Sequence, residues 1–152
     1  QTFLLQGTLM VIIAIPVLVA IYQPMPQNLV FLDWLGMIVW LIGIVFEAVG
    51  DWQLARFKSD PGNKGKVLRT GLWRYTRHPN YFGDAMVWWG YFLIALAVPY
   101  GWLSVVGPVL MTFLLKRVSG VSMLERTLKE TKPEYEHYVR CTSAFFPMPP
   151  KC

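Results

Sequence analysis

The stretch LVFLDWLGMIVWLIGIVFEAV, residues 29–49, contains no Lys or Arg and only two acidic residues, Asp33 and Glu47. An α-helix needs about 20 consecutive, predominantly apolar residues to cross the hydrocarbon core of a bilayer. This stretch meets that requirement, and three others in the chain approach it. We therefore expect four membrane-spanning helices, at residues 3–22, 29–55, 79–98 and 102–117.

Composition supports the same class of protein. Of the 152 residues, 55% are hydrophobic and 15% are charged, whereas soluble domains are about 45–50% apolar and about 25% charged. This apolar content excludes intrinsic disorder, and two cysteines, Cys141 and Cys152, are too few for a disulfide scaffold. The sequence predicts an all-α fold: one membrane domain over residues 1–152, a polytopic helix bundle of about four spans with a short cytoplasmic helix near its C-terminal end.

The basic residues indicate how this bundle is oriented. All fourteen Lys and Arg residues lie within residues 56–77 or 116–151, beside the apolar stretches. Loops rich in Lys and Arg face the cytoplasm, so we expect the loop 56–78, the tail 118–152 and both ends of the chain on that side, in the endoplasmic reticulum or a bacterial inner membrane. There the two cysteines would be free thiols. The net charge of +5 suits membrane lipids with anionic headgroups as partners, and not nucleic acid.

Small residues recur every seven positions in two of the expected helices. Such residues let helices approach closely in lipid, where packing is the main source of helix association. We predict that the two helices pack along these stripes, formed by Gly36, Gly43 and Gly50 in one helix and by Gly83, Gly90 and Ala97 in the other.

Two acidic residues, Glu47 and Asp51, are four positions apart and therefore share one helix face near the expected cytoplasmic end. Acidic side chains at membrane depth are costly unless they are paired or hydrated, which makes them candidates for a functional site. The alternative is a pair of carboxylates that form salt bridges with nearby arginines and serve packing alone.

The stretch 56–84, which comprises the loop 56–78 and the start of the third expected span, carries seven basic residues and reads RFKSDPGNKGKVLRTGLWRYTRHPNYFGD. Basic side chains beside a helix start attract anions, because the unpaired N–H groups there add positive charge. The loop therefore suits the phosphates of a nucleotide cofactor; the alternative is a basic loop that only fixes topology. Within it, His78 is either a titrating acid or base, or a helix-start residue bonded to backbone.

Two tyrosines, Tyr135 and Tyr138, lie about one turn apart in the C-terminal tail and share a helix face. They either anchor the tail at headgroup depth, where Tyr is favoured, or form a lid that stacks on a cofactor or hydrogen-bonds to it. We expect no metal site, because His78, His137 and the two tail cysteines form no ligand cluster at a workable spacing.

Several motifs together carry a family resemblance. The segment GLWRYTRHPNYFGD (71–84) is preceded by FKSDPGNKGKV (57–67) and followed by SGVSMLERTL (119–128) and PEYEHYVRCTSAFFP (133–147). This combination resembles the C-terminal domain family of steroid 5-alpha-reductases, in particular its large branch of bacterial and eukaryotic membrane proteins. More distantly, it is similar to isoprenylcysteine carboxyl methyltransferases and sterol C14 reductases. The resemblance covers the chain from the second helix onward and implies the C-terminal part of a longer fold.

In the reductases this half of the fold holds NADPH between membrane helices and cytoplasmic loops, so the resemblance implies the same cofactor here. The family's cofactor contacts and helix start are matched at Asp51, Lys58, Asn80, Tyr81 and Asp84. At Glu47 the steroid reductases typically carry an amide, and the methyltransferase relatives use Glu125 and the tail tyrosines around S-adenosylmethionine. With the basic loop included, the expected cofactor-binding residues are Glu47, Asp51, Lys58, Lys64, Arg74, Arg77, His78, Asn80, Asp84, Glu125, Tyr135 and Tyr138.

We expect an NADPH-dependent membrane oxidoreductase that reduces an activated C=C bond in a lipophilic small molecule, sterol-like or another lipid, with Tyr81 as proton donor. Seven positive charges in one loop favour a cofactor with three phosphates over a sulfonium cation. Between Gly120 and Thr127 only Arg126 is basic, unlike the arginine-rich tail of the steroid enzymes, which argues against steroids themselves as substrate. The alternatives are an S-adenosylmethionine-dependent membrane methyltransferase and a non-catalytic accessory subunit of a larger membrane complex that retains the motif.

Overall fold

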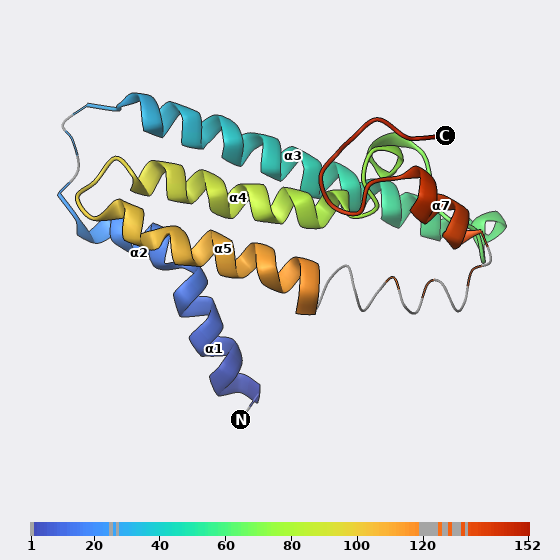
Figure 1. Ribbon diagram of the computed structural model, residues 1–152, viewed down its shortest axis with the longest axis horizontal. Helices are drawn as coiled ribbons and strands as arrows, with labels where there is room; N and C mark the ends of the chain where they lie inside the picture. Colours follow the sequence, from blue (N-terminus) through green and yellow to red (C-terminus); the bar gives the residue numbers. More distant parts are fainter. Residues whose placement is uncertain are drawn as a thin grey trace. The chain divides into compact units, whose positions relative to one another are not determined.

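The computed structural model describes residues 2–24, 26, 28–118, 125, 128, 132 and 134–152 (Figure 1). Over these residues the regular secondary structure is helical, and an isolated parallel bridge joins Thr76 and Ser143. The α-helices are α1 (Thr2–Ile13), α2 (Ile15–Tyr22), α3 (Phe31–Ser59), α4 (Pro79–Ala95), α5 (Val106–Phe113) and α7 (Tyr135–Cys141). Shorter helical turns are η1 (Pro61–Asn63), η2 (Gly71–Arg74), η3 (Gly101–Val105) and the π-helical η4 (Leu114–Val118). The predicted helical fold class is confirmed for the described residues.

In the described part of the chain, two helices are long and apolar enough to cross a membrane. These are α3, with 29 residues, and the run Gly101–Val118 through η3, α5 and η4, with 18 residues. The bent pair α1 and α2 makes a third candidate if it counts as one span. A fourth span is not confirmed, because α4 ends at Ala95 after 17 residues. Pro99 follows four positions later, and its lack of an N–H group prevents it from extending a helix.

The first expected span, residues 3–22, is interrupted near its middle. α1 ends at Ile13 and α2 begins at Ile15, and the two helix axes differ by 52°. Pro16 lies in the first turn of α2, where its missing N–H leaves no hydrogen bond unmade. In a continuous helix its ring would clash with the carbonyl group four residues earlier, so this proline explains the break.

The structure divides into two compact units, and each is described by itself. The first unit comprises residues 1–43 and 85–113, and the second comprises residues 44–84 and 114–152. α3 and α4 contribute residues to both units, whereas α1, α2 and α5 belong to the first unit and α7 belongs to the second. Within the first unit, α5 contacts α1, α2 and η3.

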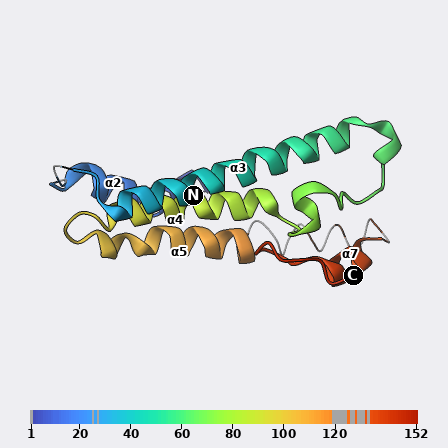
Figure 2. The same ribbon diagram turned by 90° about the horizontal axis from the view of Figure 1, so that it is seen from above.

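In the first unit, α3 and α4 approach each other through glycines and run side by side (Figures 1 and 2). A Cβ atom built on Gly36 would lie 2.8 Å from the Gly90 carbonyl oxygen, and one built on Gly90 would lie 2.8 Å from the Gly36 carbonyl oxygen. Real Cβ atoms do not make contacts this short, so only glycine permits this approach. The predicted packing is confirmed at these two positions. In the second unit, a Cβ on Gly50 would lie 3.1 Å from the Pro79 ring.

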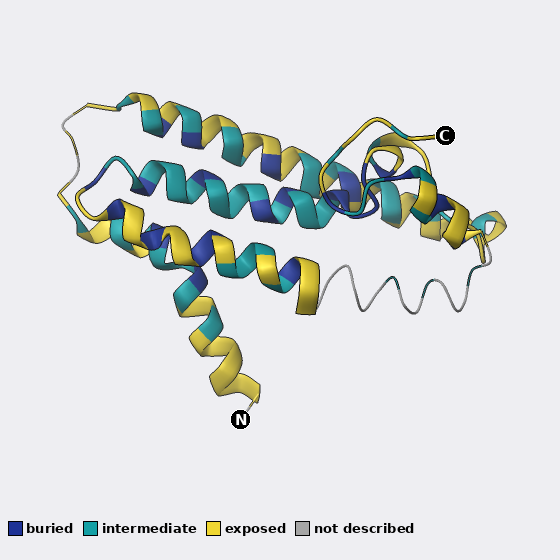
Figure 3. Ribbon diagram, in the orientation of Figure 1, coloured by how far each residue is buried: buried dark blue, intermediate teal, exposed yellow. Residues whose placement is uncertain are grey.

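Large apolar side chains of the first unit point outward. Phe3 and Leu4 of α1 are 87% and 77% exposed, and Figure 3 shows most of α1 as exposed surface. The same holds on α3, where Phe31 is 76% exposed. Extensive exposed apolar surface indicates contact with lipid or with other apolar segments. Together with the length of α3, this surface identifies an integral membrane protein.

Replacing Gly90 with Ala tests whether the glycine contact holds the first unit together. The added methyl group meets backbone atoms of α3, which cannot move aside as side chains can, so we expect the variant to lose about 1–3 kcal/mol of stability. Thermal unfolding of the detergent-solubilised protein, followed by circular dichroism, measures this loss. Gly7→Ala in α1 is the matched control, because nothing lies within 4 Å of a Cβ there. Equal melting temperatures for the two variants would contradict the assigned packing.

Candidate functional site

A tight turn carries the chain from the end of α3 into the loop of the second unit. The Asp60 Oδ1 atom accepts a hydrogen bond from the Gly62 N–H at 2.8 Å, and Pro61 occupies the start of η1. The Asn63 side-chain amide donates to the Phe57 carbonyl oxygen at 3.1 Å, which satisfies a carbonyl group at the end of α3. The DPGN sequence therefore forms a specific turn and is more than a flexible connection.

Two hydrogen bonds fasten η2 against α3. The Trp73 indole N–H donates to the Gly50 carbonyl oxygen at 3.1 Å, and the Leu72 N–H donates to Gln53 Oε1 at 3.0 Å. Gly71, which begins η2, has a φ of +61°, a left-handed conformation that residues with a Cβ rarely adopt. The basic loop thus leaves α3 at Ser59 and returns to the same helix.

The C-terminal tail pairs with the segment that leads into α4. The Arg77 N–H donates to the Ser143 carbonyl oxygen at 2.9 Å, beside the bridge between Thr76 and Ser143. The Thr76 hydroxyl group, which is fully buried, donates to the Phe145 carbonyl oxygen at 2.9 Å. These bonds hold the start of α4 against the tail, so the orientation of residues 77 and 78 depends on a segment far along the chain.

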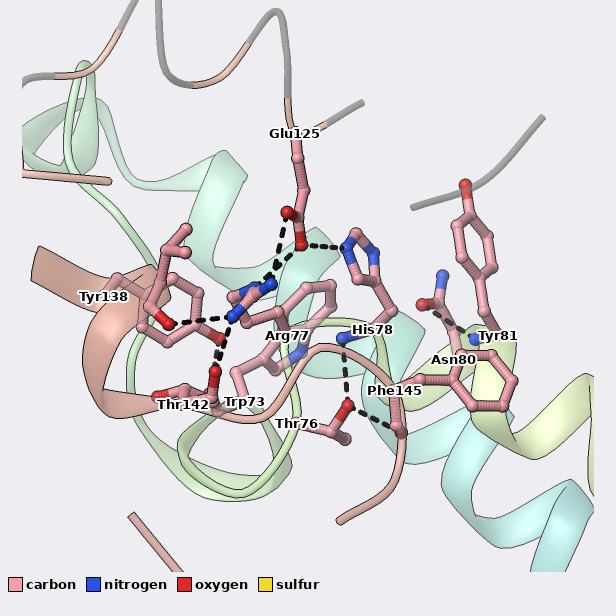
Figure 4. A network of polar contacts seen from close by, with 11 residues as sticks. Trp73, Thr76, Arg77, His78, Asn80, Tyr81, Glu125, Tyr138, Thr142 and Phe145 are labelled. Atoms are coloured by element: carbon pink, nitrogen blue, oxygen red, sulfur yellow. Dashed lines mark hydrogen bonds and ion pairs between the residues drawn. The ribbon is translucent and has the colours of Figure 1, made fainter. Parts of the chain in front are cut away.

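The Arg77 guanidinium is at the centre of this arrangement (Figure 4). Its Nε and Nη2 atoms donate to the two carboxylate oxygens of Glu125, at 2.7 and 3.2 Å, in a bidentate ion pair. Its Nη1 atom donates to the carbonyl oxygens of Val139 and Thr142, at 2.9 and 2.6 Å. These carbonyl groups lie at the C-terminal end of α7, where the helix dipole favours a cation. The Arg77 side chain is only 8% exposed.

His78 extends the same network. Its Nε2 atom lies 3.2 Å from Glu125 Oε1, the oxygen that also accepts from Arg77 Nε, and its side chain is 2% exposed. A carboxylate only accepts hydrogen bonds, so Nε2 carries the proton in this contact. The imidazole also stacks on Tyr81, with ring centroids 5.4 Å apart and planes 2° from parallel. The His78 side chain is therefore tied to a carboxylate group, not to backbone.

Glu125 is ionised in this setting. Burial alone would raise the pKa of its carboxyl group, but hydrogen bonds from His78 and Arg77, together with their charges, lower that pKa below its ordinary value of 4.5. Both neighbours donate hydrogen bonds to the charged form and thereby favour it. Protonation of Glu125 consequently opposes the folded network.

Tyr135 and Tyr138 of α7 are buried, each 3% exposed. The Tyr138 hydroxyl donates to the Trp73 carbonyl oxygen at 2.5 Å, and the two tyrosine rings meet at a centroid distance of 5.8 Å. Burial raises the pKa of both phenol groups, and the Glu125 charge raises that of Tyr135 further, so both stay neutral. Tyrosines that anchor a tail at headgroup depth would be exposed, whereas these two pack inside the second unit.

These segments surround a cavity of about 370 Å³ within the second unit. That volume lies in the range of small-molecule and cofactor sites. The apolar and aromatic wall is formed by Leu54, Phe57, Val67, Leu68, Trp73, Leu128, Tyr135 and Tyr138. The polar lining is formed by Lys58, Asp60, Asn63, Lys64, Arg77, His78 and Lys132.

Three lysines, Lys58, Lys64 and Lys132, make the cavity electropositive. Arg77 adds little net charge, because its guanidinium is paired with Glu125. Asp60 offsets one lysine, which leaves a positive balance over the whole lining. Such a lining attracts a ligand that carries more than one negative charge.

The structure brings together part of the set of residues expected from the sequence. Six of them line the cavity: Lys58, Lys64, Arg77, His78, Tyr135 and Tyr138. Glu125 is outside the lining and acts on it through Arg77 and His78. These residues lie in separate parts of the sequence, and their meeting is a result of the tertiary structure.

The remaining expected residues do not line this cavity. Asn80 Nδ2 donates to Asp51 Oδ1 at 2.8 Å, and Glu47 lies within electrostatic range of Asp84 and Asp51. Glu47, Asp51 and Asp84 thus form an acidic group, and its member Asp51 is bonded to Asn80 in the first turn of α4.

Two further expected residues have other surroundings. Arg74 lines a second, smaller hollow, which also includes Arg69 and Cys141. Tyr81 stacks on His78, and only the histidine of this pair is part of the cavity lining.

Sequence reasoning missed several residues of the lining. Asp60 and Asn63 lie in the DPGN turn, and the capping role of such residues before a helical turn was a usable signal. Trp73 and Lys132 carry no comparable local signal. Lys132 comes close to the loop only in the folded chain, where its Nζ atom donates to the Lys66 carbonyl oxygen.

The two cysteines, expected to be free thiols, are joined in a disulfide. The tail returns to α7, where the Lys151 N–H donates to the Cys141 carbonyl oxygen at 2.9 Å. This bond brings the Cα atoms of Cys141 and Cys152 to 5.2 Å, an ordinary spacing for a disulfide. The expectation of free thiols was wrong for this structure, because the path of the chain brings the two sulfurs together. The four-residue spacing within α7 places His137 Nε2 3.6 Å from Cys141 Sγ, and the tail brings Cys152 to the same place. The expectation that His137 and the tail cysteines form no ligand group was therefore wrong.

Comparison with known proteins places the chain in a family. Residues 1–142 match the family described as protein of unknown function (DUF1295), which is a steroid 5-alpha-reductase-like family. The chain belongs to this family. The match includes Arg77, Glu125 and every residue that lines the cavity, and it confirms the resemblance found in the sequence motifs.

The curated relatives match shorter parts of the chain. A 3-oxo-5-alpha-steroid 4-dehydrogenase 1 from Bos taurus is 36% identical over 78 residues, which cover 46% of this chain and 30% of the relative. The Homo sapiens protein of that name is 37% identical over 65 residues, covering 42% and 25%. A probable O-methyltransferase from Ustilaginoidea virens is 44% identical over 46 residues, covering 30% and 16%. The chain thus spans less than a third of the length of these relatives. No solved structure matches it.

Arg77→Met removes the cation at the centre of the network. We expect a loss of about 3–5 kcal/mol of stability, because the largely buried Glu125 carboxylate and two carbonyl groups lose their shared partner. Arg69→Met is the control, since the Arg69–Glu134 pair is 46% and 60% exposed and should contribute less than about 1 kcal/mol. Chemical denaturation in detergent compares the two variants. Similar losses for both would mean that the Arg77 network is not the main polar support of the second unit.

The lowered pKa of Glu125 also predicts how stability depends on pH. A depressed carboxyl pKa stabilises the folded state fully above the unfolded value, near pH 4.5, and this contribution disappears as the pH falls through the folded pKa. We expect the melting temperature of the wild type to exceed that of Glu125→Gln at pH 7, with the difference shrinking below pH 4.5. Melting curves from pH 7 to pH 3 measure it. A constant difference across this range would show that Glu125 does not titrate as described.

Proposed function

We propose that this protein is an NADPH-dependent membrane oxidoreductase that reduces an activated C=C bond in a lipophilic substrate, sterol-like or another lipid. One observation carries the proposal: three lysines and an aromatic wall share one cavity. The similarity to 3-oxo-5-alpha-steroid 4-dehydrogenases supports it. The family match supports it as well, since the cavity lies entirely within the matched residues.

The residues of the cavity fit a nucleotide that carries several phosphate groups. Lys58, Lys64 and Lys132 offer ammonium groups, which bind phosphates as point charges. Trp73 and Tyr135 offer aromatic surface against which a planar ring can pack. The bound cofactor would supply the hydride, and the protein would supply orientation and charge compensation.

Arg77 and Glu125 have a positioning role in this proposal. Four of the five N–H groups of the guanidinium already donate to Glu125, Val139 and Thr142, so Arg77 has little capacity left for a phosphate. The network instead fixes His78 and the end of α7 around the cavity. The three lysines are therefore assigned as the phosphate ligands.

Tyr81 is the proposed proton donor. Reduction of an activated C=C bond develops negative charge on the activating group, and a phenol hydroxyl can donate a hydrogen bond and then its proton to that group. The Tyr81 ring stacks on His78, which lines the cavity, so the phenol lies next to the lining. The acidic group at Glu47, Asp51 and Asp84 is proposed to position the first turn of α4 through Asn80.

An S-adenosylmethionine-dependent methyltransferase is the second candidate. The match to a probable O-methyltransferase over 46 residues favours it. The charge of the cavity argues against it, because three lysines repel a sulfonium cation and its ammonium group more than they attract the single carboxylate.

The setting proposed for the reaction is the membrane surface. The basic loop 56–78 and the tail 118–152 would face the cytoplasm, in the endoplasmic reticulum or a bacterial inner membrane, with anionic lipids as neighbours. A lipophilic substrate would reach the site from the bilayer. A larger membrane complex could contribute further walls of the substrate pocket.

A titration of the detergent-solubilised protein with each cofactor separates these candidates. NADPH at 100 times its dissociation constant should stabilise the protein by about 2.7 kcal/mol, and S-adenosylmethionine should have no effect. Thermal unfolding provides the measurement. Stabilisation by S-adenosylmethionine alone would establish the methyltransferase, and no response to either would favour the accessory subunit.

Two lysines of the same loop test the site itself. Lys64→Met should weaken NADPH binding about 10-fold to 100-fold, since a hydrogen bond to a charged group contributes about 1.5–3 kcal/mol. Lys66→Met is the matched control. It removes the same positive charge from a position two residues further along the chain, and the Lys66 side chain is outside the cavity lining. Equal effects of the two substitutions would indicate that the loop provides only bulk positive charge.

A further inference from the structure

A second group of reactive side chains lies outside the cavity, where the tail meets α7. The ligand atoms of His137, Cys141 and Cys152 all lie within 4.8 Å of one another. His137 and Cys141 are four positions apart on α7 and therefore share one face of the helix. Cys152 reaches this face from the tail, and the two sulfurs form the disulfide. Neither the cavity nor the proposed reduction uses these three residues.

We propose that, once this disulfide is reduced, His137, Cys141 and Cys152 form a binding site for a thiophilic divalent cation of the zinc class. A dithiol reductant supplies two electrons and two protons to the Cys141–Cys152 disulfide and is itself oxidised to a disulfide. The protein is left with two thiols. The cation then displaces both thiol protons and is bound by two thiolates and one neutral imidazole. Three protein ligands with an open fourth position form an ordinary zinc site, and soft thiolate ligands favour this metal.

A backbone hydrogen bond holds these ligands together in addition to the disulfide. The Lys151 N–H bond to the Cys141 carbonyl oxygen, at 2.9 Å, fixes the residue before Cys152 against the end of α7. With Zn–S bonds of about 2.3 Å, two sulfurs on a tetrahedral ion lie about 3.8 Å apart. The three ligand atoms are already grouped on this scale. Side-chain rotation after reduction is therefore the main adjustment that the site requires.

The charges around the group favour the ligating form of the cysteines. Arg69 and Arg74 line the same hollow as His137, Cys141 and Cys152. Nearby cations stabilise thiolates, and the thiolate is the form that binds a metal. Two thiolates neutralise a divalent cation, so the occupied site adds no net positive charge beside the arginines.

In the proposed topology the two cysteines face the cytoplasm, where the reduced, metal-binding form can be present. A tail in the cytoplasm meets thiol reductants that keep most cysteines reduced. The cation would then replace the disulfide as the link between residue 152 and α7, the helix whose final carbonyl groups hold Arg77. This consequence rests on the proposed cytoplasmic side, whereas the ligand geometry does not.

Cobalt(II), which replaces zinc in thiolate sites and is visible by absorbance, is the probe. The full chain in detergent is reduced with dithiothreitol, which is then removed without oxygen, and thiol titration should rise from zero to two per chain. The reduced protein should bind one cobalt ion with a sulfur-to-metal charge-transfer band, which zinc abolishes. The oxidised protein should show no band. A disulfide that resists reduction in the folded protein, or a reduced protein without the band, would overturn the proposal.

Substitutions assign the ligands. Cys141→Ser and Cys152→Ser should each weaken cobalt binding by more than about 100-fold, since even residues that only support a ligand change affinity by about 10–100-fold. His137→Gln should weaken it at least about 10-fold, and Glu136→Gln, an exposed neighbour outside the group, should leave it unchanged. If a cysteine variant does not fold, wild-type protein alkylated after reduction replaces it and should likewise bind no cobalt. Binding that survives alkylation, or equal affinity in all variants, would contradict the assignment.

Discussion

The buried guanidinium of Arg77 imposes the constraint on which the second unit depends. A charge removed from water is strongly destabilising unless it is paired and its hydrogen bonds are satisfied. Here the ion-pair partner, Glu125, is 48 positions away, and the accepting carbonyl groups of Val139 and Thr142 are further still. Satisfying one cation therefore requires the start of α4, Glu125 and the end of α7 to meet. The cavity is a consequence, because His78, Tyr135 and Tyr138 lie on those same segments.

A different force organises the first unit. In lipid there is little hydrophobic gain from bringing apolar helices together, so close packing must stabilise their association. The contact between Gly36 and Gly90 provides such packing, while side chains such as Phe3 and Phe31 face outward. The second unit instead relies on ion pairs and on hydrogen bonds to backbone. The two units are thus held together by two different kinds of contact.

The Arg77 network also shows a structural use for the first two residues of the RHPNYFGD motif. Arg77 is directed at Glu125 and at the protein's own carbonyl groups, and His78 is directed at Glu125, so both side chains join distant segments of the second unit. The three lysines of the cavity lining, Lys58, Lys64 and Lys132, all lie outside that motif. In the proposed function these lysines bind the phosphates, whereas Arg77 holds the walls of the cavity in place.

Local patterns in the sequence were enough to predict the helical fold class, the long apolar helix α3 and the close approach of Gly36 and Gly90. They also marked six residues of the cavity, because a basic loop and a pair of tyrosines one turn apart are visible without any knowledge of the fold. Such patterns report the preference of one helix or one turn. They do not report which distant residues meet, and so the Arg77–Glu125 pair, the position of Lys132 and the joining of Cys141 to Cys152 were decided by the tertiary structure. The physical reason is that a buried charge, a cavity wall and a disulfide each depend on the path of the chain between their members, and no local preference specifies that path.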